Sequence, residues 1–371
     1  MGFSNARAAV LRTFGAELEI ESFEVVDPGP GAVVVEVKGG GVCGTDVHLR
    51  DGHLAMPRPV VLGHEGVGVV AALGKGVTGD ALGAPLEVGD KVTWASSIAC
   101  GRCFYCRQER EPTLCEDRSV YGINRRADEP PYLSGSWADF QYLDPGSTIV
   151  ALPKGVSLEA AIALGCAGPT AVHGVLGFAR PQVGATVVIQ GSGPVGLAAA
   201  MYVRLAGAAR IVMIGGPAAR LERARGLGVV DVVIDVFDVT DLLGRVAAVV
   251  DETPGRRGAD VVVEATGVPS AVAEGLEMCR LNAIFLVLGQ YTDAGATPIN
   301  PHLITRKQLK VFGSWGLSGA DVVDFVRTLP QLTKRFDLAS LVSSYALEDV
   351  NRALEDVRAG SVTKAVLSPN G

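Results

Sequence analysis

Four of the seven cysteines lie close together in the chain, at a spacing that suits a metal ion. A structural zinc ion takes four protein ligands in a tetrahedron, and thiolates from closely spaced cysteines are frequent ligands. The four residues are Cys100, Cys103, Cys106 and Cys115, separated by two, two and eight residues. This spacing predicts a closed metal site in which every ligand comes from the protein.

Two further cysteines and one histidine predict a second metal site with a different chemistry. Each lies in a glycine-flanked segment: Cys43 in Gly-Val-Cys-Gly, His64 in Gly-His-Glu-Gly and Cys166 in Gly-Cys-Ala-Gly. One cysteine or histidine alone is more often part of a core or a turn than a ligand. Two thiolates and one imidazole together match a ligand set of zinc sites that oxidise alcohols, where a fourth position stays open. The seventh cysteine, Cys279, lies in a helix-like stretch and is expected to be a plain buried thiol.

A glycine-rich motif further along the chain predicts a dinucleotide-binding turn. The motif consists of Gly191, Ser192, Gly193, Pro194, Val195 and Gly196. It follows an apolar run at 186–190 and precedes a helical stretch, which is the context that such a turn requires. The first glycine permits a tight turn, the second lets the backbone approach a pyrophosphate, and the third lets the helix pack on the strand.

The next apolar run, at 210–214, bears on the choice between NAD and NADP. It ends at Gly215, where a NAD-selective site places an acidic residue on the ribose 2′-hydroxyl. The absence of that carboxylate removes a repulsion toward a 2′-phosphate. Arg220 could pair with such a phosphate, could lie along the adenine ribose, or could be an ordinary solvated residue. The choice of cofactor stays open, with a slight preference for NADP.

Two textures along the 371 residues predict two domains. Short β-like runs between Gly, Pro and Asp turns fill residues 8–95 and indicate an antiparallel barrel. From about residue 184 the pattern changes to apolar strand, glycine turn and helix, which is typical of a parallel sheet covered by helices. A helix at 347–358 and a strand at 364–367 are expected to rejoin the first domain.

Composition excludes some classes of function. The chain has 33 basic and 40 acidic residues, a net charge of −7, and the two signs are interspersed, so no basic surface for nucleic acid is expected. No apolar run approaches the ~18 residues of a membrane span, and no targeting segment is evident, so we expect a cytoplasmic protein without a membrane partner. In a reducing compartment, clustered cysteines bind metal more readily than they form disulfides.

These motifs, in this order and over nearly the whole chain, resemble the zinc-dependent medium-chain alcohol dehydrogenase family. The resemblance implies an α/β fold with a β-barrel: a GroES-like catalytic domain at 1–167 and 311–371, and a Rossmann cofactor domain, doubly wound around a parallel sheet, at 168–310. A structural-zinc lobe is expected at about 96–118. Two zinc ions per chain are implied, a catalytic one on Cys43, His64 and Cys166 and a structural one on the clustered cysteines. A homodimer or homotetramer is also implied.

The resemblance further implies individual roles. Glu65 would be an alternate zinc ligand, Asp46 would orient His64, and Thr45 followed by His48 would relay the alcohol proton. His48 could also be a surface histidine of no function, and His53, His173 and His302 match no catalytic position. The glycine motif, with Gly215 and Arg220, is implied to contact the cofactor. Further contacts are implied for Thr170, Thr266 and Leu288, and Lys364 would contact the pyrophosphate. The alternative for Lys364 is a strand-flanking lysine without a role.

The reaction implied is reversible hydride transfer between an alcohol or carbonyl compound and NAD(P), with zinc as Lewis acid. By the same resemblance the substrate pocket would include Leu54, Ser96, Trp137 and residues around Trp315. The small Ser96 leaves room for a branched or cyclic secondary alcohol, and Trp137 could instead anchor the barrel. The segment 121–125 resembles a bacterial subgroup that acts on cyclic or terpenoid alcohols. The individual alcohol and the physiological direction are not predicted.

Two other classes of protein stay in view. A zinc-free, quinone-reductase-like member of the same fold would lack the set of Cys43, His64 and Cys166. A non-catalytic zinc-binding module would need a recognition helix or a basic stripe after its cysteine cluster, and none is evident. The gap of eight residues before Cys115 exceeds the family's usual seven, which leaves a distorted or metal-free lobe as an alternative to a filled zinc site.

Overall fold

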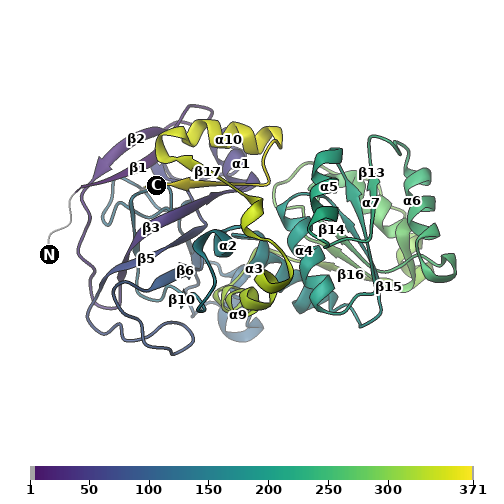
Figure 1. The fold of residues 1–371 in the computed structure, drawn as a ribbon, viewed down its shortest axis with the longest axis horizontal. Helices are drawn as coiled ribbons and strands as arrows, with labels where there is room; N and C mark the ends of the chain where they lie inside the picture. Colours follow the sequence, from purple (N-terminus) through teal and green to yellow (C-terminus); the bar gives the residue numbers. More distant parts are fainter. Residues whose placement is uncertain (1–4, 370–371) are drawn as a thin grey trace. The chain divides into compact units, whose positions relative to one another are not determined.

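The computed structural model describes residues 5–369, and the chain divides into two compact units. The first unit comprises the chain up to Cys166 together with the chain from Leu317 onward, and the second comprises Ala167–Gly316 (Figure 1). The sequence placed the second boundary after residue 310. The structure puts it later, because β16 (Lys310–Gly313) pairs in parallel with β15 (Cys279–Val287) in the sheet of the second unit.

The first unit is built on mostly antiparallel sheets. The largest has the strand order β10-β6-β5-β3-β18-β17, with β9 also paired to β3. Its strands are β3 (Val33–Val42), β5 (Gly66–Leu73), β6 (Lys91–Trp94), β9 (Phe140–Leu143), β10 (Ile149–Ala151), β17 (Val342–Ala346) and β18 (Lys364–Ser368). Because β18 runs antiparallel beside β3, the end of the chain completes the sheet that its beginning starts.

Smaller sheets and helices close this unit. A three-stranded sheet has the order β2-β1-β4, and a short pair joins β7 to β8. These strands are β1 (Ala6–Leu11), β2 (Glu19–Phe23), β4 (Val60–Val61), β7 (Ser97–Ile98) and β8 (Ser119–Val120). The α-helices are α1 (Gly44–Asp51), α2 (Leu158–Ile162), α9 (Gly319–Arg335) and α10 (Val350–Ala359), with one-turn helices at Tyr105–Glu109, Pro112–Leu114, Ala339–Leu341 and Leu347–Asp349.

The core of the first unit shows that Trp137 does not line a pocket, contrary to one expectation from the sequence. Its side chain has no exposed surface, and its indole Nε1 donates a hydrogen bond of 3.0 Å to the carbonyl oxygen of Gly41. It packs with Leu49 and Leu62 under helices α1 and α10. Trp137 therefore anchors the barrel, the alternative that the sequence had also allowed.

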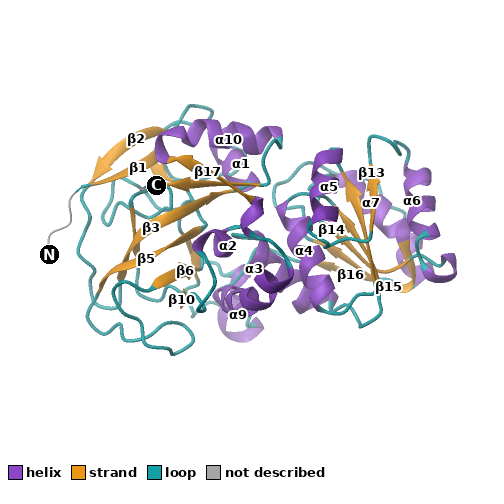
Figure 2. Cartoon of the chain, viewed as in Figure 1, coloured by secondary structure: helices purple, strands orange, loops and turns teal. Residues whose placement is uncertain are grey.

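The second unit is a doubly wound parallel sheet, as the sequence predicted (Figure 2). Its strand order is β13-β12-β11-β14-β15-β16, and every pairing is parallel. The strands not yet given are β11 (Thr186–Gln190), β12 (Arg210–Gly215), β13 (Val232–Asp235) and β14 (Ala259–Glu264). The helices are α3 (Ala167–Ala171), α4 (Pro194–Leu205), α5 (Ala218–Gly226), α6 (Leu242–Asp251), α7 (Pro269–Met278) and α8 (Pro301–Lys307), with further turns at Val172–Ala179 and Pro254–Arg256.

Burial of the central strands explains their composition. Every residue of β11 is buried, and the strand reads Thr-Val-Val-Ile-Gln, since a parallel strand covered on both faces needs apolar side chains throughout. Cys279 is buried as expected, but it begins β15 and does not lie in a helix, because α7 ends at Met278. Within residues 5–369, no helix combines the length and apolarity that crossing a membrane would need.

Candidate active site

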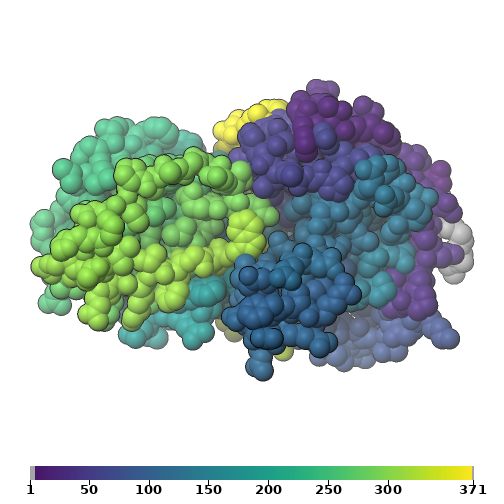
Figure 3. Space-filling view, turned by 180° about the vertical axis from the view of Figure 1, so that it is seen from behind, coloured from purple at the N-terminus to yellow at the C-terminus, as the bar shows by residue number. Residues whose placement is uncertain are grey.

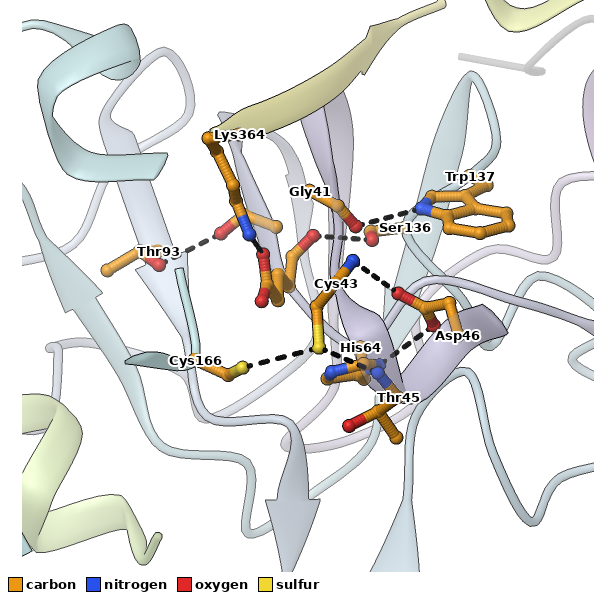
Figure 4. A network of polar contacts seen from close by, with 12 residues as sticks. Gly41, Cys43, Thr45, Asp46, His64, Thr93, Ser136, Trp137, Cys166 and Lys364 are labelled. Carbon is orange, nitrogen blue, oxygen red and sulfur yellow. Dashed lines mark hydrogen bonds and ion pairs between the residues drawn. The ribbon is translucent and has the colours of Figure 1, made fainter. Parts of the chain in front are cut away.

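Four potential ligands converge in the first unit. One ligand atom from each of Cys43, His64, Glu65 and Cys166 lies within 4.8 Å of all the others. The Sγ atoms of Cys43 and Cys166 are 3.8 Å apart (Figure 4). With Zn–S bonds of about 2.3 Å, a tetrahedral ion sets two sulfurs about 3.8 Å apart. The donor set and its spacing therefore fit zinc.

Local structure places Cys43 at the start of helix α1. Its side chain accepts a hydrogen bond of 3.2 Å from the backbone N–H of Thr45, and Asp46 Oδ2 accepts one of 2.9 Å from the backbone N–H of Cys43. This is a capping box with a cysteine in the role that serine usually takes. The helix start thus fixes the direction of the thiol and of the carboxylate together.

Asp46 also orients His64. The Nδ1 atom of His64 lies 3.0 Å from Asp46 Oδ1, and both side chains are buried. If Nδ1 donates to the carboxylate, Nε2 is the nitrogen available for a metal, and such a partner raises the basicity of the ligand. Burial raises the pKa of Asp46. For His64, burial opposes protonation, but the charges of Asp46 and Cys43 outweigh it and raise the pKa well above its usual value.

The two thiols differ in acidity when no metal is present. The S–H of Cys166 donates to Cys43, which lowers the pKa of Cys43 well below its usual value and raises the pKa of Cys166 well above it. Cys43 therefore forms a thiolate readily, whereas Cys166 keeps its proton. Since both sulfurs must be thiolates to bind zinc, metal binding releases protons at this site.

Lys364 lies beside this group, and the role at the cofactor pyrophosphate that the resemblance implied for it stays a prediction. Its Nζ forms an ion pair with Glu65 Oε2, and the two side chains are only 3% and 1% exposed. Gly41 and Gly165 leave the space that the Glu65 carboxylate occupies, because a Cβ at either position would come within 2.1 Å of Glu65 Oε2. Lys364 begins β18, and Glu65 directly precedes β5.

Glu65 keeps one oxygen without a partner in the described structure. Its Oε1 atom is buried and accepts no hydrogen bond from the described residues. A buried carboxylate oxygen is costly to leave unpaired, so a ligand at this point would stabilise it. This supports a cation beside Glu65, the residue that the sequence suggested as an alternate ligand.

Thr45 and His48 share helix α1, three residues apart, so their side chains lie on the same face. Thr45 contacts the metal group through its backbone N–H, which donates to Cys43 Sγ, and His48 Nδ1 lies 3.1 Å from His53 Nδ1. The sequence had given His53 no role. The proton relay through Thr45 and His48 stays a prediction.

The four clustered cysteines also come together. Their sulfur atoms lie within 4.8 Å of one another, in a rounded lobe on the surface of the first unit (Figure 3). Backbone N–H groups of Cys100 and Cys103 donate to Cys115 Sγ at 3.2 Å and to Cys100 Sγ at 3.4 Å. Short helical turns at Tyr105–Glu109 and Pro112–Leu114 take up the eight residues before Cys115. The longer gap is therefore compatible with a four-sulfur site.

The acidity of these thiols is uneven. The backbone N–H of Glu116, followed by that of Cys106, lowers the pKa of Cys103 to about 6. Burial, and the hydrogen bond with Cys103, raise the pKa of Cys106 to about 12. The backbone donors thus prepare one thiolate at neutral pH before any metal arrives.

The glycine motif in the second unit has the geometry that a pyrophosphate requires. Gly191 follows β11 with φ of 112°, and a Cβ at Gly196 would lie 1.9 Å from the carbonyl oxygen of Gly191. Gly193 caps helix α4, with Pro194 and Val195 in its first turn, and nothing lies within 4 Å of where its Cβ would be. The helix therefore begins at an open point where backbone N–H groups can meet an anion.

Gly215 and Arg220 lie at the next strand end, as predicted. A Cβ on Gly215 would come within 3.0 Å of several atoms of Ser192, so a side chain there would displace the turn. Arg220 lies in the first turn of α5, and burial, followed by the charge of Arg223, lowers its pKa. The structure thus leaves the ribose position without a carboxylate on β12.

Glu264 lies in a turn that the sequence placed near the cofactor, but no role of its own was predicted for its carboxylate. Its carboxylate, with no exposed surface, accepts hydrogen bonds from the backbone N–H and hydroxyl of Thr266, each 2.6 Å, and from the N–H of Gly267 at 3.0 Å. Its carbonyl oxygen accepts the N–H of Leu288 at 2.9 Å. Glu264 therefore fixes two of the turns expected at the cofactor. An acidic residue at the end of an apolar strand was the signal available.

The other residues that the sequence suggested for the cofactor or the substrate pocket are Thr170, Leu54, Ser96 and Trp315. Thr170 lies half-buried in α3. Leu54 packs against the core under α1, and Ser96 accepts the N–H of Tyr121 through its carbonyl oxygen. Trp315, in the second unit, is 40% exposed and stacks on Tyr291 with the ring centroids 4.8 Å apart.

Comparison with known proteins agrees with this geometry. Residues 29–154 match the alcohol dehydrogenase GroES-like domain, and residues 194–333 match the zinc-binding dehydrogenase domain. The chain is 37% identical to 5-exo-hydroxycamphor dehydrogenase of Pseudomonas putida over 98% of both chains.

Solved structures give the same result. An alcohol dehydrogenase from Thermotoga maritima has a TM-score of 0.93 at 33% identity, covering 99% of this chain and 100% of that one. A zinc-binding dehydrogenase from Sinorhizobium meliloti, bound to NADP, has a TM-score of 0.86 at 25% identity, covering 99% and 100%. These matches confirm the GroES-like and Rossmann domains that the resemblance implied. The chain belongs to the zinc-dependent medium-chain dehydrogenase family.

Proposed function

We propose that the protein oxidises a cyclic or branched secondary alcohol with NAD(P) and catalyses the reverse reduction, using one zinc ion for catalysis. The observation that carries this proposal is the group of two sulfurs, 3.8 Å apart, with a carboxylate-oriented imidazole, in a chain that also has a dinucleotide-binding turn. Family membership supports an oxidoreductase acting on CH–OH groups.

Different residues of the first unit would hold the metal ion and orient its ligands. Cys43, His64 and Cys166 would hold the ion, and Asp46 would keep His64 in the tautomer that presents Nε2. When bound, zinc supplies Lewis acidity that lowers the pKa of the alcohol, and nicotinamide accepts the hydride.

The proton released by the alcohol needs a route to solvent. The Thr45 hydroxyl and the His48 imidazole follow one another on a single helix face, and the family resemblance suggests this order of transfer. Glu65, held by Lys364, would stay beside the metal as an alternate ligand. The four clustered cysteines would hold a structural zinc ion that does not take part in the reaction.

The cofactor is proposed to be NADP in preference to NAD. Gly215 presents no carboxylate to repel a 2′-phosphate, and Arg220 lies in the first turn of the next helix. The Sinorhizobium meliloti relative bound to NADP supports this choice. Initial rates with both cofactors test it, and a higher kcat/KM with NAD would overturn it.

The substrate is proposed to be a cyclic alcohol. Ser96 offers a small side chain, and the Pseudomonas putida relative is named for 5-exo-hydroxycamphor, which is a cyclic alcohol. Following the family, we also expect a cytoplasmic homodimer or homotetramer, which light scattering on the purified protein would check.

A panel of linear, branched and cyclic secondary alcohols, assayed with each cofactor, tests the proposal. Cyclic alcohols should give the highest kcat/KM. Cys43→Ser should lose turnover and still bind nucleotide, because Cys43 and the glycine motif belong to different units. A zinc-free reductase of the same fold would be favoured if Cys43→Ser kept full activity.

A further inference from the structure

His48 and His53 form a pair of imidazoles at the end of helix α1. Their Nδ1 atoms lie 3.1 Å apart, and their ring centroids lie 5.4 Å apart with the planes tilted by 44°. This is a hydrogen-bonding distance between two groups that can each donate or accept.

The turn at the end of helix α1 brings the two histidines together. Gly52 ends α1 in the left-handed conformation, with φ of 82°, and packs against Phe14 so closely that a Cβ would come within 2.9 Å of that ring. The turn brings the backbone N–H of His53 to 3.0 Å from the carbonyl oxygen of His48. The backbone hydrogen bond therefore holds His53 close to His48, so their contact does not depend on side-chain conformation alone.

A hydrogen bond between two imidazoles couples their tautomers. One Nδ1 must carry a proton and the other must offer a lone pair, so the tautomer of one ring determines the tautomer of the other. If Nδ1 of His48 donates, its Nε2 is a proton acceptor, and Nε2 of His53 carries the second N–H. The two rings then form a short path with an acceptor at one end and a donor at the other.

We infer that His53 is a positioning residue that fixes the tautomer of His48 and passes the alcohol proton on to solvent. A proton that arrives at Nε2 of His48 allows the Nδ1 proton of His48 to move to Nδ1 of His53, and the Nε2 proton of His53 then leaves to water. One proton enters and one leaves, and the pair ends in the reversed tautomers, which proton exchange with water returns to the starting state before the next turnover. His48 is half-buried and His53 is exposed, which suits this direction of transfer.

Nearby charged groups are engaged elsewhere. On α1 itself, Arg50 pairs with Glu355 at 2.7 Å and Asp51 pairs with Arg358 at 2.6 Å, both across to helix α10. Arg58 lies over the Phe14 ring, 3.9 Å from its centroid. The charged side chains of α1 and α10 thus form ion pairs with one another, and the two imidazoles form their hydrogen-bonding contact with each other.

The inference rests on the proposed alcohol oxidation, and two replacements of His53 separate its parts. His53→Phe keeps a ring of similar size but removes the hydrogen bond to His48. His53→Gln keeps a group that can bond to Nδ1 of His48 but cannot pass a proton through. His302→Gln, in helix α8 of the second unit, changes another exposed histidine and is the matched control.

Single-turnover formation of reduced nicotinamide in dilute buffer is the kinetic readout. Both His53 variants should be slower by about tenfold, less than the ~10²–10⁴-fold typical of a group acting directly on the reacting proton. Added imidazole should restore their rates, since a free base in solution can replace a missing link, whereas it could not repair a folding defect. The control should match the wild type.

The ¹⁵N spectrum of the His48 ring is the second readout and needs no turnover. The wild type and His53→Gln should show one dominant tautomer of His48, and His53→Phe should show a mixture. Wild-type rates in dilute buffer for His53→Phe, or an unchanged His48 tautomer in it, would overturn the inference. If the wild type oxidises no alcohol, the proposed function fails, and the tautomer measurement still decides whether His53 sets the state of His48.

Discussion

The Sγ atoms of Cys43 and Cys166 lie 3.8 Å apart although 123 positions separate them in the chain. Cys43 caps the first helix of the first unit, and Cys166 is the last residue of that unit before the second begins. The chain folds to bring these thiols to a distance that a tetrahedral zinc ion requires, and the metal content of variants follows from that relationship.

Purified protein should contain about two zinc ions per chain, because each group of ligands suits one ion. Cys166→Ser should lose about one of them, and Cys103→Ser should lose the other, as measured by elemental mass spectrometry. Each variant is the control for the other. An unchanged zinc content in either would mean that the corresponding group of cysteines holds no zinc.

Asp46→Asn should weaken zinc binding at the first site by about 10–100-fold, because the amide cannot orient His64 as the carboxylate does. Competition with a chromophoric chelator measures the affinity. Asp51→Asn, which alters a carboxylate on the same helix that pairs with Arg358, should leave the affinity unchanged. Equal affinities for the two variants would show that Asp46 has no such role.

Lys364→Met should lower the free energy of unfolding by about 3–5 kcal/mol, because it leaves the buried carboxylate of Glu65 without its partner. Adding Glu65→Gln to this variant should recover part of the loss. Arg102→Met breaks a largely exposed pair with Asp117 and should cost less than about 0.5 kcal/mol. Urea denaturation measures all three, and a loss for Lys364→Met no larger than that of the control would contradict the buried pair.

Gly193→Ala should bind cofactor at least about tenfold more weakly without loss of stability. No atom of the protein lies within 4 Å of the added methyl group, so only the approach of a pyrophosphate is obstructed. Gly226→Ala, equally unobstructed in helix α5, should bind cofactor normally. Fluorescence titration with reduced nicotinamide nucleotide measures the affinity. Tight binding by Gly193→Ala would place the phosphates elsewhere.

In zinc-depleted protein, Cys103 should react with iodoacetamide faster than Cys106 at neutral pH. The pKa of Cys103 lies at about 6 and that of Cys106 at about 12, so at pH between these values only Cys103 is mainly thiolate. Reactivity follows the thiolate, so the rate at Cys103 should fall as the pH drops below about 6. Peptide mass spectrometry after a short pulse measures both rates, and similar rates would contradict the assignment.

The sequence predicted the second unit well, because its signals are local. The strand at 186–190 is confirmed to the residue, since a strand buried on both faces must be apolar throughout and glycine follows it. The glycine motif is likewise local: Gly191 and Gly196 meet a steric demand within a few residues or across a neighbouring strand end, and Gly193 leaves open space at the start of the helix.

The contacts that the sequence did not predict are mostly between positions that lie far apart in the chain. Lys364 pairs with a carboxylate 299 positions away, and no local pattern indicates that contact. Trp137 lies in the core, where its indole N–H donates to Gly41 in β3, 96 positions away. The contact of His53 depends on the left-handed turn at Gly52, which brings it back to His48.

The most direct test of the proposed function is oxidation of a cyclic secondary alcohol by zinc-depleted and zinc-restored protein, followed by the formation of NADPH. Turnover should be lost on depletion, should return with zinc, and should not return in Cys43→Ser. Full turnover without zinc, or in Cys43→Ser, would contradict it.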